Sequence, residues 1–138
     1  MITVFKTVEF AAAHDIPNHP GKCRGLHGHN YVVTVGITNP TGEVDSVTGM
    51  VEDFGDVKIA IQATIIDKCD HKYLNDVYPD MLTTAELLAQ RWLKELREID
   101  KRYMFIRVFE TGNSSVEIDL RLPYLAQDHV NAYHEPGR

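Results

Sequence analysis

The 138-residue chain has only two cysteines, no long apolar run and no excess of positive charge. Cys23 and Cys69 are too few for a disulfide framework, and no apolar run approaches the roughly 18–20 residues of a membrane span. The N-terminal segment 1–6 lacks the basic-then-apolar order of a secretion signal, so we expect a cytoplasmic protein without a membrane partner. The formal net charge of −6 argues against bulk nucleic-acid binding, which needs lysine and arginine gathered on one face.

The patterning that is present predicts an α+β domain. Runs rich in β-branched and alternating apolar residues predict strands at 2–13, 31–37, 103–111 and 115–122. Two helices are predicted between them, and the order ββααββ favours a four-stranded antiparallel sheet with two helices on one face. We expect 1–122 to be the catalytic domain and 123–138 a mobile C-terminal extension. In that extension we expect His129 and His134 to be solvated.

The helices are predicted from apolar residues at three- and four-residue spacing, over about 54–68 and from 83 onward. The expected buried stripes are Phe54, Val57, Ile61 and Ile65 in the first helix, and Leu88, Trp92, Leu96 and Ile99 in the second.

The strand 103–111 has apolar residues on both faces, because Phe105 and Phe109 alternate with Ile106 and Val108. A second exposed apolar face and free strand edges are an aggregation risk. We therefore expect subunits to close sheet against sheet in a homo-oligomer.

Histidines dominate the chemistry. His27 and His29 flank Gly28 at the start of a strand, so their side chains share a face with Cα atoms roughly 6–7 Å apart. His14, which follows three alanines at the end of the first strand, is the expected third ligand. Three histidines with an open fourth position are typical of catalytic zinc. Solvated histidines at strand ends are the plainer alternative.

A thiol and a carboxylate–histidine pair are the candidate proton carriers. Cys23 precedes His27 by four residues and could close a zinc site as a fourth ligand, but we favour it as a base, since a thiol near histidine and a metal loses its proton more easily. In Asp70-His71 the carboxylate can fix the imidazole tautomer, although a solvated pair in a loop is the alternative. Cys69 is most simply an apolar filler at the end of the first helix.

Two glutamates remain. Glu86 fits a capping box in Thr83-Thr84-Ala85-Glu86, in which the glutamate bonds back to the N-cap amide. Glu110 shares a face with Ile106 and Val108 and should point inward, where a carboxylate is costly unless it is paired. A ring edge that offers two N–H donors would pair both of its oxygens.

Six short motifs in order give the chain a family resemblance. They are Ala12-Ala13-His14, Cys23-x-x-x-His27-Gly28-His29, Gly49-Met50-Val51-Glu52-Asp53-Phe54, Asp70-His71-Lys72-Tyr73-Leu74-Asn75, Thr84-Ala85-Glu86 and Phe109-Glu110-Thr111. The set resembles the 6-pyruvoyl-tetrahydropterin synthase family over about residues 3–121. The three residues between Cys23 and His27 look like the carboxy-forming branch of queuosine biosynthesis, since the pyruvoyl-forming branch typically has five. Cys69 and Thr83 depart from the family pattern, which often has leucine and proline there.

The resemblance implies a T-fold (ββααββ) whose trimers close into a barrel and stack as a hexamer, with active sites between subunits. It implies zinc held by His14, His27 and His29, proton transfer by Cys23, Asp70 and His71, and a pterin bound by Glu110 with Thr84 nearby. The implied reaction converts 7,8-dihydroneopterin triphosphate to 6-carboxy-5,6,7,8-tetrahydropterin, acetaldehyde and triphosphate. A pyruvoyl-forming enzyme and a non-catalytic pterin-binding homologue are the alternatives. Lys22 and Arg24 could meet the triphosphate, or lie in a solvated loop.

Overall fold

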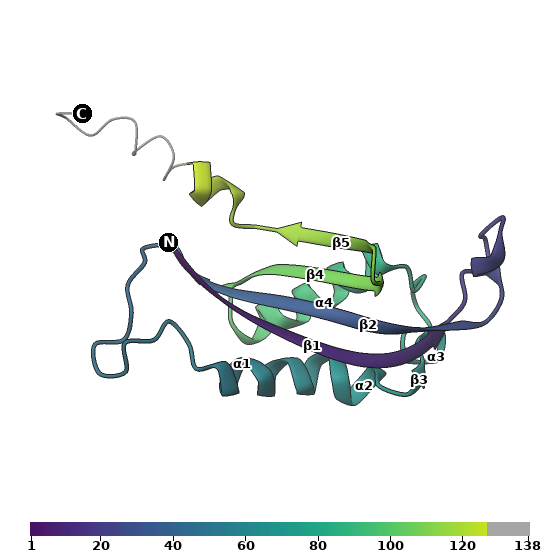
Figure 1. Cartoon of the computed structure of the whole chain (residues 1–138), viewed down its shortest axis with the longest axis horizontal. Helices are drawn as coiled ribbons and strands as arrows, with labels where there is room; N and C mark the ends of the chain where they lie inside the picture. Colours follow the sequence, from purple (N-terminus) through teal and green to yellow (C-terminus); the bar gives the residue numbers. More distant parts are fainter. Residues whose placement is uncertain (127–138) are drawn as a thin grey trace.

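The computed structural model describes residues 1–126. Its strands are β1 (Ile2–His14), β2 (His27–Asn39), β3 (Lys72–Tyr73), β4 (Tyr103–Thr111) and β5 (Ser114–Asp119). Its helices are η1 (Lys22–Arg24), α1 (Phe54–Ile61), η2 (Gln62–Ile66), α2 (Asp67–Cys69), α3 (Leu74–Val77) and α4 (Ala85–Ile99). Figure 1 shows a twisted sheet with α1 along one edge and α4 behind it.

The predicted α+β class is confirmed, but the predicted four-stranded, all-antiparallel sheet is wrong in one detail. The sheet has five strands in the order β3-β1-β2-β4-β5. The added strand β3 pairs in parallel with Ala12 and Ala13 at the end of β1, and the other neighbours pair antiparallel. A two-residue strand has no alternation to detect, so its pairing depends on tertiary contacts.

The first predicted helix is present as a continuous helical segment from α1 through α2, with the π-helical turn η2 in its middle. Val57, Ile61 and Ile65 are fully buried, as predicted. The placement of Phe54 in the core is wrong, since it is the first residue of α1 and is 63% exposed.

The second predicted helix is α4, whose stripe of Leu88, Trp92 and Leu96 is buried. Ile99, its last residue, is 59% exposed, so its predicted burial is wrong. Thr84 is the N-cap, and its hydroxyl accepts a hydrogen bond from the Leu87 amide at 3.2 Å. Glu86 therefore stands one position too early for the predicted capping box, in which the glutamate is the third residue after the cap.

The face of the sheet away from the helices carries Phe105 on β4, as predicted. The chain itself covers this ring, which is only 5% exposed: Phe5 makes an edge contact with it and the Arg121 guanidinium lies 4.9 Å from its centroid. Gly36 makes this packing possible, since a Cβ there would lie 2.9 Å from the Phe105 Cβ. Part of the apolar surface that predicted an oligomer is thus covered within one subunit.

The last strand ends earlier than predicted, at Asp119. Val116 and Ile118 pack against the core, but Leu120 follows the strand and is exposed. Residues 122–126 are helical, and the remainder of the predicted extension, with His129 and His134, lies outside the described residues. Within residues 1–126, no helix has the length and hydropathy needed to cross a membrane.

Candidate metal centre and the cavity around it

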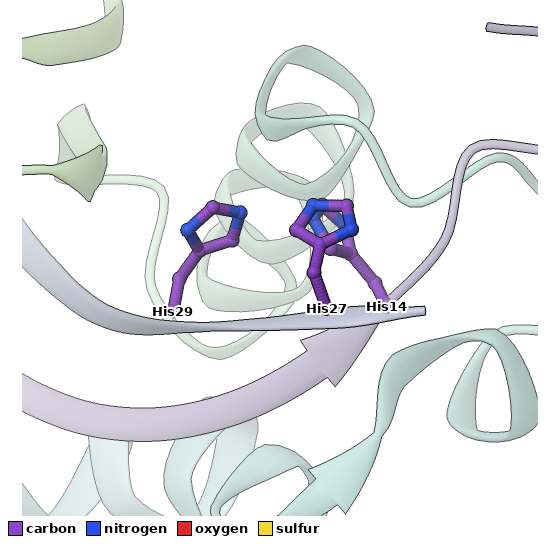
Figure 2. A group of neighbouring side chains, drawn as sticks. All are labelled: His14, His27 and His29. Carbon is purple, nitrogen blue, oxygen red and sulfur yellow. The ribbon is translucent and has the colours of Figure 1, made fainter. Parts of the chain in front are cut away.

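The sheet register brings the three predicted ligands together. β1 and β2 pair so that His14 lies opposite His27 and Ala12 opposite His29. All three histidines therefore project from the same face, beyond the end of the hydrophobic core formed by Phe10 and its neighbours. Figure 2 shows the rings gathered above these two strands, and one ring nitrogen of each lies within 4.8 Å of the others.

Backbone carbonyls fix the orientation of two of these rings. Nδ1 of His14 donates to the Thr83 carbonyl at 2.8 Å, and Nδ1 of His27 donates to the Gly25 carbonyl at 2.7 Å. Each bond leaves Nε2 as the unprotonated nitrogen, which is the arrangement that metal-binding histidines use. Nε2 of His14 and Nε2 of His29 are buried and have no hydrogen-bond partner. Buried polar atoms are rarely left unpaired, so the donor set fits a bound metal ion.

The electrostatics favour a neutral His29 ring. Burial lowers the pKa of His29 below its ordinary value, and the neighbouring His14 and His27 lower it further, while Glu110 opposes the shift. An imidazole must be unprotonated to bind a metal. The Glu110 carboxylate approaches to 3.6 Å from Nε2 of His14, and so places negative charge beside the position a cation would take.

A cavity of about 190 Å³ opens beside the cluster. It brings together five residues predicted from the sequence, namely His14, Cys23, His27, Thr84 and Glu110. His29 completes the ligand set from the adjoining strand position. The inward orientation predicted for Glu110 is confirmed by its contact with His14.

Asp70 and His71 do not line this cavity. They lie where α2 gives way to β3 at the sheet edge. His71 lines a second cavity of about 560 Å³, whose lining also includes Ala11, Ala13 and His29. The predicted pairing is present, since Nδ1 of His71 lies 2.8 Å from the Asp70 carboxylate. The His71 side chain is 82% exposed.

The backbone holds His71 in an unusual conformation. Its φ of 58° lies in the left-handed region, which costs a residue other than glycine about 1–3 kcal/mol. The His71 amide donates to the Ala11 carbonyl at 2.7 Å, and the Ala11 amide donates to Asp70 at 3.2 Å. The pair is therefore anchored to β1, while the His71 ring is presented to the exterior.

Three residues of the site were not found from the sequence. Thr83 supplies the carbonyl that orients His14, and Glu86 and His19 line the metal cavity. Glu86 could have been found if the two adjacent threonines had been weighed as alternative caps. The Thr83 carbonyl and the exposed loop residue His19 have no sequence pattern that would predict their place in the site.

The fold and the site define a class: a small α+β protein with a three-histidine cluster that could hold a metal ion, open to a cavity. Residues 3–120 match the family described as 6-pyruvoyl tetrahydropterin synthase, and the chain belongs to this family. A solved 6-pyruvoyl tetrahydropterin synthase from Caenorhabditis elegans has a TM-score of 0.76 at 25% identity, with 86% of this chain and 94% of that chain covered.

Curated relatives carry the names of two activities. A 6-carboxy-5,6,7,8-tetrahydropterin synthase from Synechocystis is 36% identical over 99 residues, which are 71% of this chain and 77% of the relative. A human 6-pyruvoyl tetrahydrobiopterin synthase is also 36% identical, over 104 residues that are 70% and 69% of the two chains.

Proposed function

We propose that the protein converts 7,8-dihydroneopterin triphosphate and water to 6-carboxy-5,6,7,8-tetrahydropterin, acetaldehyde and triphosphate, with zinc held by His14, His27 and His29. The observation that carries the proposal is the meeting of these histidines with Cys23 and Glu110 around one cavity. The three-residue spacer between Cys23 and His27 favours the carboxy-forming branch over the pyruvoyl-forming one.

Each residue around the cavity has a separate proposed role in the reaction. The Glu110 carboxylate would accept two N–H donors from the aminopyrimidine edge of the pterin, with Thr84 nearby, and so orient the side chain of the substrate toward the histidines. Cys23 lines the same cavity and would take a proton from that side chain as a thiolate. When bound, zinc would act as a Lewis acid that eases proton loss from the substrate hydroxyls. Lys22 and Arg24, which flank Cys23, are exposed and would meet the triphosphate.

We further propose that the working site is shared between copies in a homo-oligomer, a hexamer built as a dimer of trimers. The metal cavity of one chain, at about 190 Å³, is below the roughly 300–1,000 Å³ of typical ligand sites. The Asp70–His71 pair faces outward from the same chain, so it is placed to serve a neighbour. There the carboxylate would hold the Nδ1 proton, which leaves Nε2 to exchange protons with substrate.

The product assay tests this function. Purified protein incubated with 7,8-dihydroneopterin triphosphate and zinc should release acetaldehyde and 6-carboxytetrahydropterin. Mass spectrometry identifies both products. A product that keeps the three-carbon side chain would instead identify the pyruvoyl-forming reaction. Unchanged substrate with metal-loaded protein would contradict catalysis and favour a pterin-binding role.

A further inference from the structure

We infer that Asn75 is a positioning residue for the metal centre: it fixes the strand end that carries His14 to the carbonyl that orients the His14 ring. The inference rests on the proposed metal site, and it assigns to Asn75 a role in metal affinity. Asn75 lies in α3, and its side chain bonds to Asp15 and Thr83 and not to the histidines themselves.

The first step is the His14 ring itself. Within residues 1–126, the shortest hydrogen bond that holds this ring runs from Nδ1 to the Thr83 carbonyl, at 2.8 Å. The Tyr31 and Thr83 hydroxyls approach the same nitrogen at 3.4 Å and are too distant to replace it. If residue 83 moved, the His14 ring could rotate, and its Nε2 would no longer point toward the other two rings.

The second step is how residue 83 is held. It lies in the segment that leads from α3 to α4, and its hydroxyl donates to Oδ1 of Asn75 at 3.0 Å. The Asn75 side chain also bonds to the backbone of Asp15, the residue after His14. The Asp15 backbone N–H donates to Oδ1 at 3.1 Å, and Nδ2 donates to the Asp15 carbonyl at 2.9 Å. One side chain thus joins both ends of the His14–Thr83 contact.

The chemistry of this contact selects asparagine. Oδ1 accepts hydrogen bonds from two donors, and Nδ2 donates one to a carbonyl. The contact therefore uses both the oxygen and the nitrogen of the amide. Aspartate would lose the Nδ2 donor and put a second carboxylate near Asp15, and an apolar residue would leave the Asp15 and Thr83 groups unpaired. Direct hydrogen-bond partners of metal-binding histidines typically change metal affinity by about 10–100-fold when they are removed, and Asn75, one contact further out, should act at the lower end of this range.

The matched control is Tyr73→Phe. The Tyr73 hydroxyl donates to the Asp15 carboxylate at 2.5 Å, so it ties the same strand end to the same segment of chain without touching residue 83. A loss of metal affinity through general loosening would appear in both variants, whereas a loss through the Thr83 carbonyl would appear only at Asn75.

The experiment measures zinc affinity of the wild type, Asn75→Ala and Tyr73→Phe by chelator competition, with the absorption spectrum of the cobalt-loaded proteins as a second readout. We expect Asn75→Ala to bind zinc about 10-fold more weakly with an altered cobalt spectrum, and Tyr73→Phe to match the wild type. Thr83→Val, which keeps the carbonyl but removes the hydroxyl, should shift affinity in the same direction and serves if Asn75→Ala does not fold.

The outcomes separate the two claims. A wild type that binds no zinc would overturn the metal centre and the inference together. Wild-type affinity in both Asn75→Ala and Thr83→Val, or equal weakening in Asn75→Ala and Tyr73→Phe, would overturn the positioning role and leave the metal centre standing.

Discussion

Cys23→Ala should lower turnover by about 10²–10⁴ while the protein still binds zinc, because general acid–base groups typically contribute that much. Cys23 lines the cavity from η1, whereas the proposed metal ligands are the three histidines on β1 and β2. Removal of the thiol therefore takes away the proposed base and spares the metal. The measurement pairs a rate assay with zinc content of the same preparation.

Cys69→Ala is the control for this variant. Its sulfur is fully buried at the end of α2, lies 3.5 Å from the Tyr78 hydroxyl and does not line the cavity that Cys23 lines. The substitution should reduce stability and preserve turnover. Undiminished turnover in Cys23→Ala would remove the assigned base, and loss of zinc from Cys23→Ala would show that the sulfur is a fourth ligand instead.

Two inactive variants should restore activity when they assemble together. If Cys23 of one copy works with His71 of another, random mixing of Cys23→Ala and His71→Ala chains leaves about a quarter of the sites with both groups intact. The physical reason is that the two residues line separate cavities within one chain. The assay compares the co-expressed pair with each variant alone.

The site also supplies a control for co-assembly. Cys23 and His27 line the same cavity of one chain. Mixing Cys23→Ala with His27→Ala chains would therefore leave about a quarter of the sites intact only if metal and base came from different copies. On the proposed arrangement, intact Cys23 and intact His27 never occur in the same chain, and this pair should stay inactive. Activity from this second pair, or none from the first, would contradict the shared site.

The predictable part of the fold is the part set by local pattern. Alternating apolar residues predicted β1, β2 and β4, and the apolar stripe predicted α4. Both patterns are visible in the sequence because the buried face of each element repeats along the chain. The predicted burial of Phe54 and Ile99 was wrong for a shared reason. Each residue lies at a helix end, where the periodic apolar stripe continues but the core does not. Strand β3 could not be predicted, because two residues carry no period and pair only through the placement of β1.

The clustering of the three histidines was predictable for a different reason. Strand parity puts His27 and His29 on one face, and an antiparallel neighbour that ends in His14 can reach them. The orienting groups were not predictable, since the Thr83 carbonyl carries no side-chain signature and Asn75 acts through backbone atoms of Asp15. The separation of Asp70–His71 from the cavity also needed three-dimensional placement. The catalytic roles of Cys23, Asp70 and His71 and the substrate contacts of Thr84 and Glu110 stay predictions.

Zinc content is the most direct test of the account. Protein purified and dialysed without added chelator should retain about one zinc ion per chain, and His29→Ala should lose it while keeping its fold, because a site with two histidines left holds the ion far more weakly. Metal analysis beside a circular dichroism spectrum measures both. A wild type without affinity for zinc, or a folded His29→Ala that binds it as tightly as the wild type, would contradict the three-histidine centre.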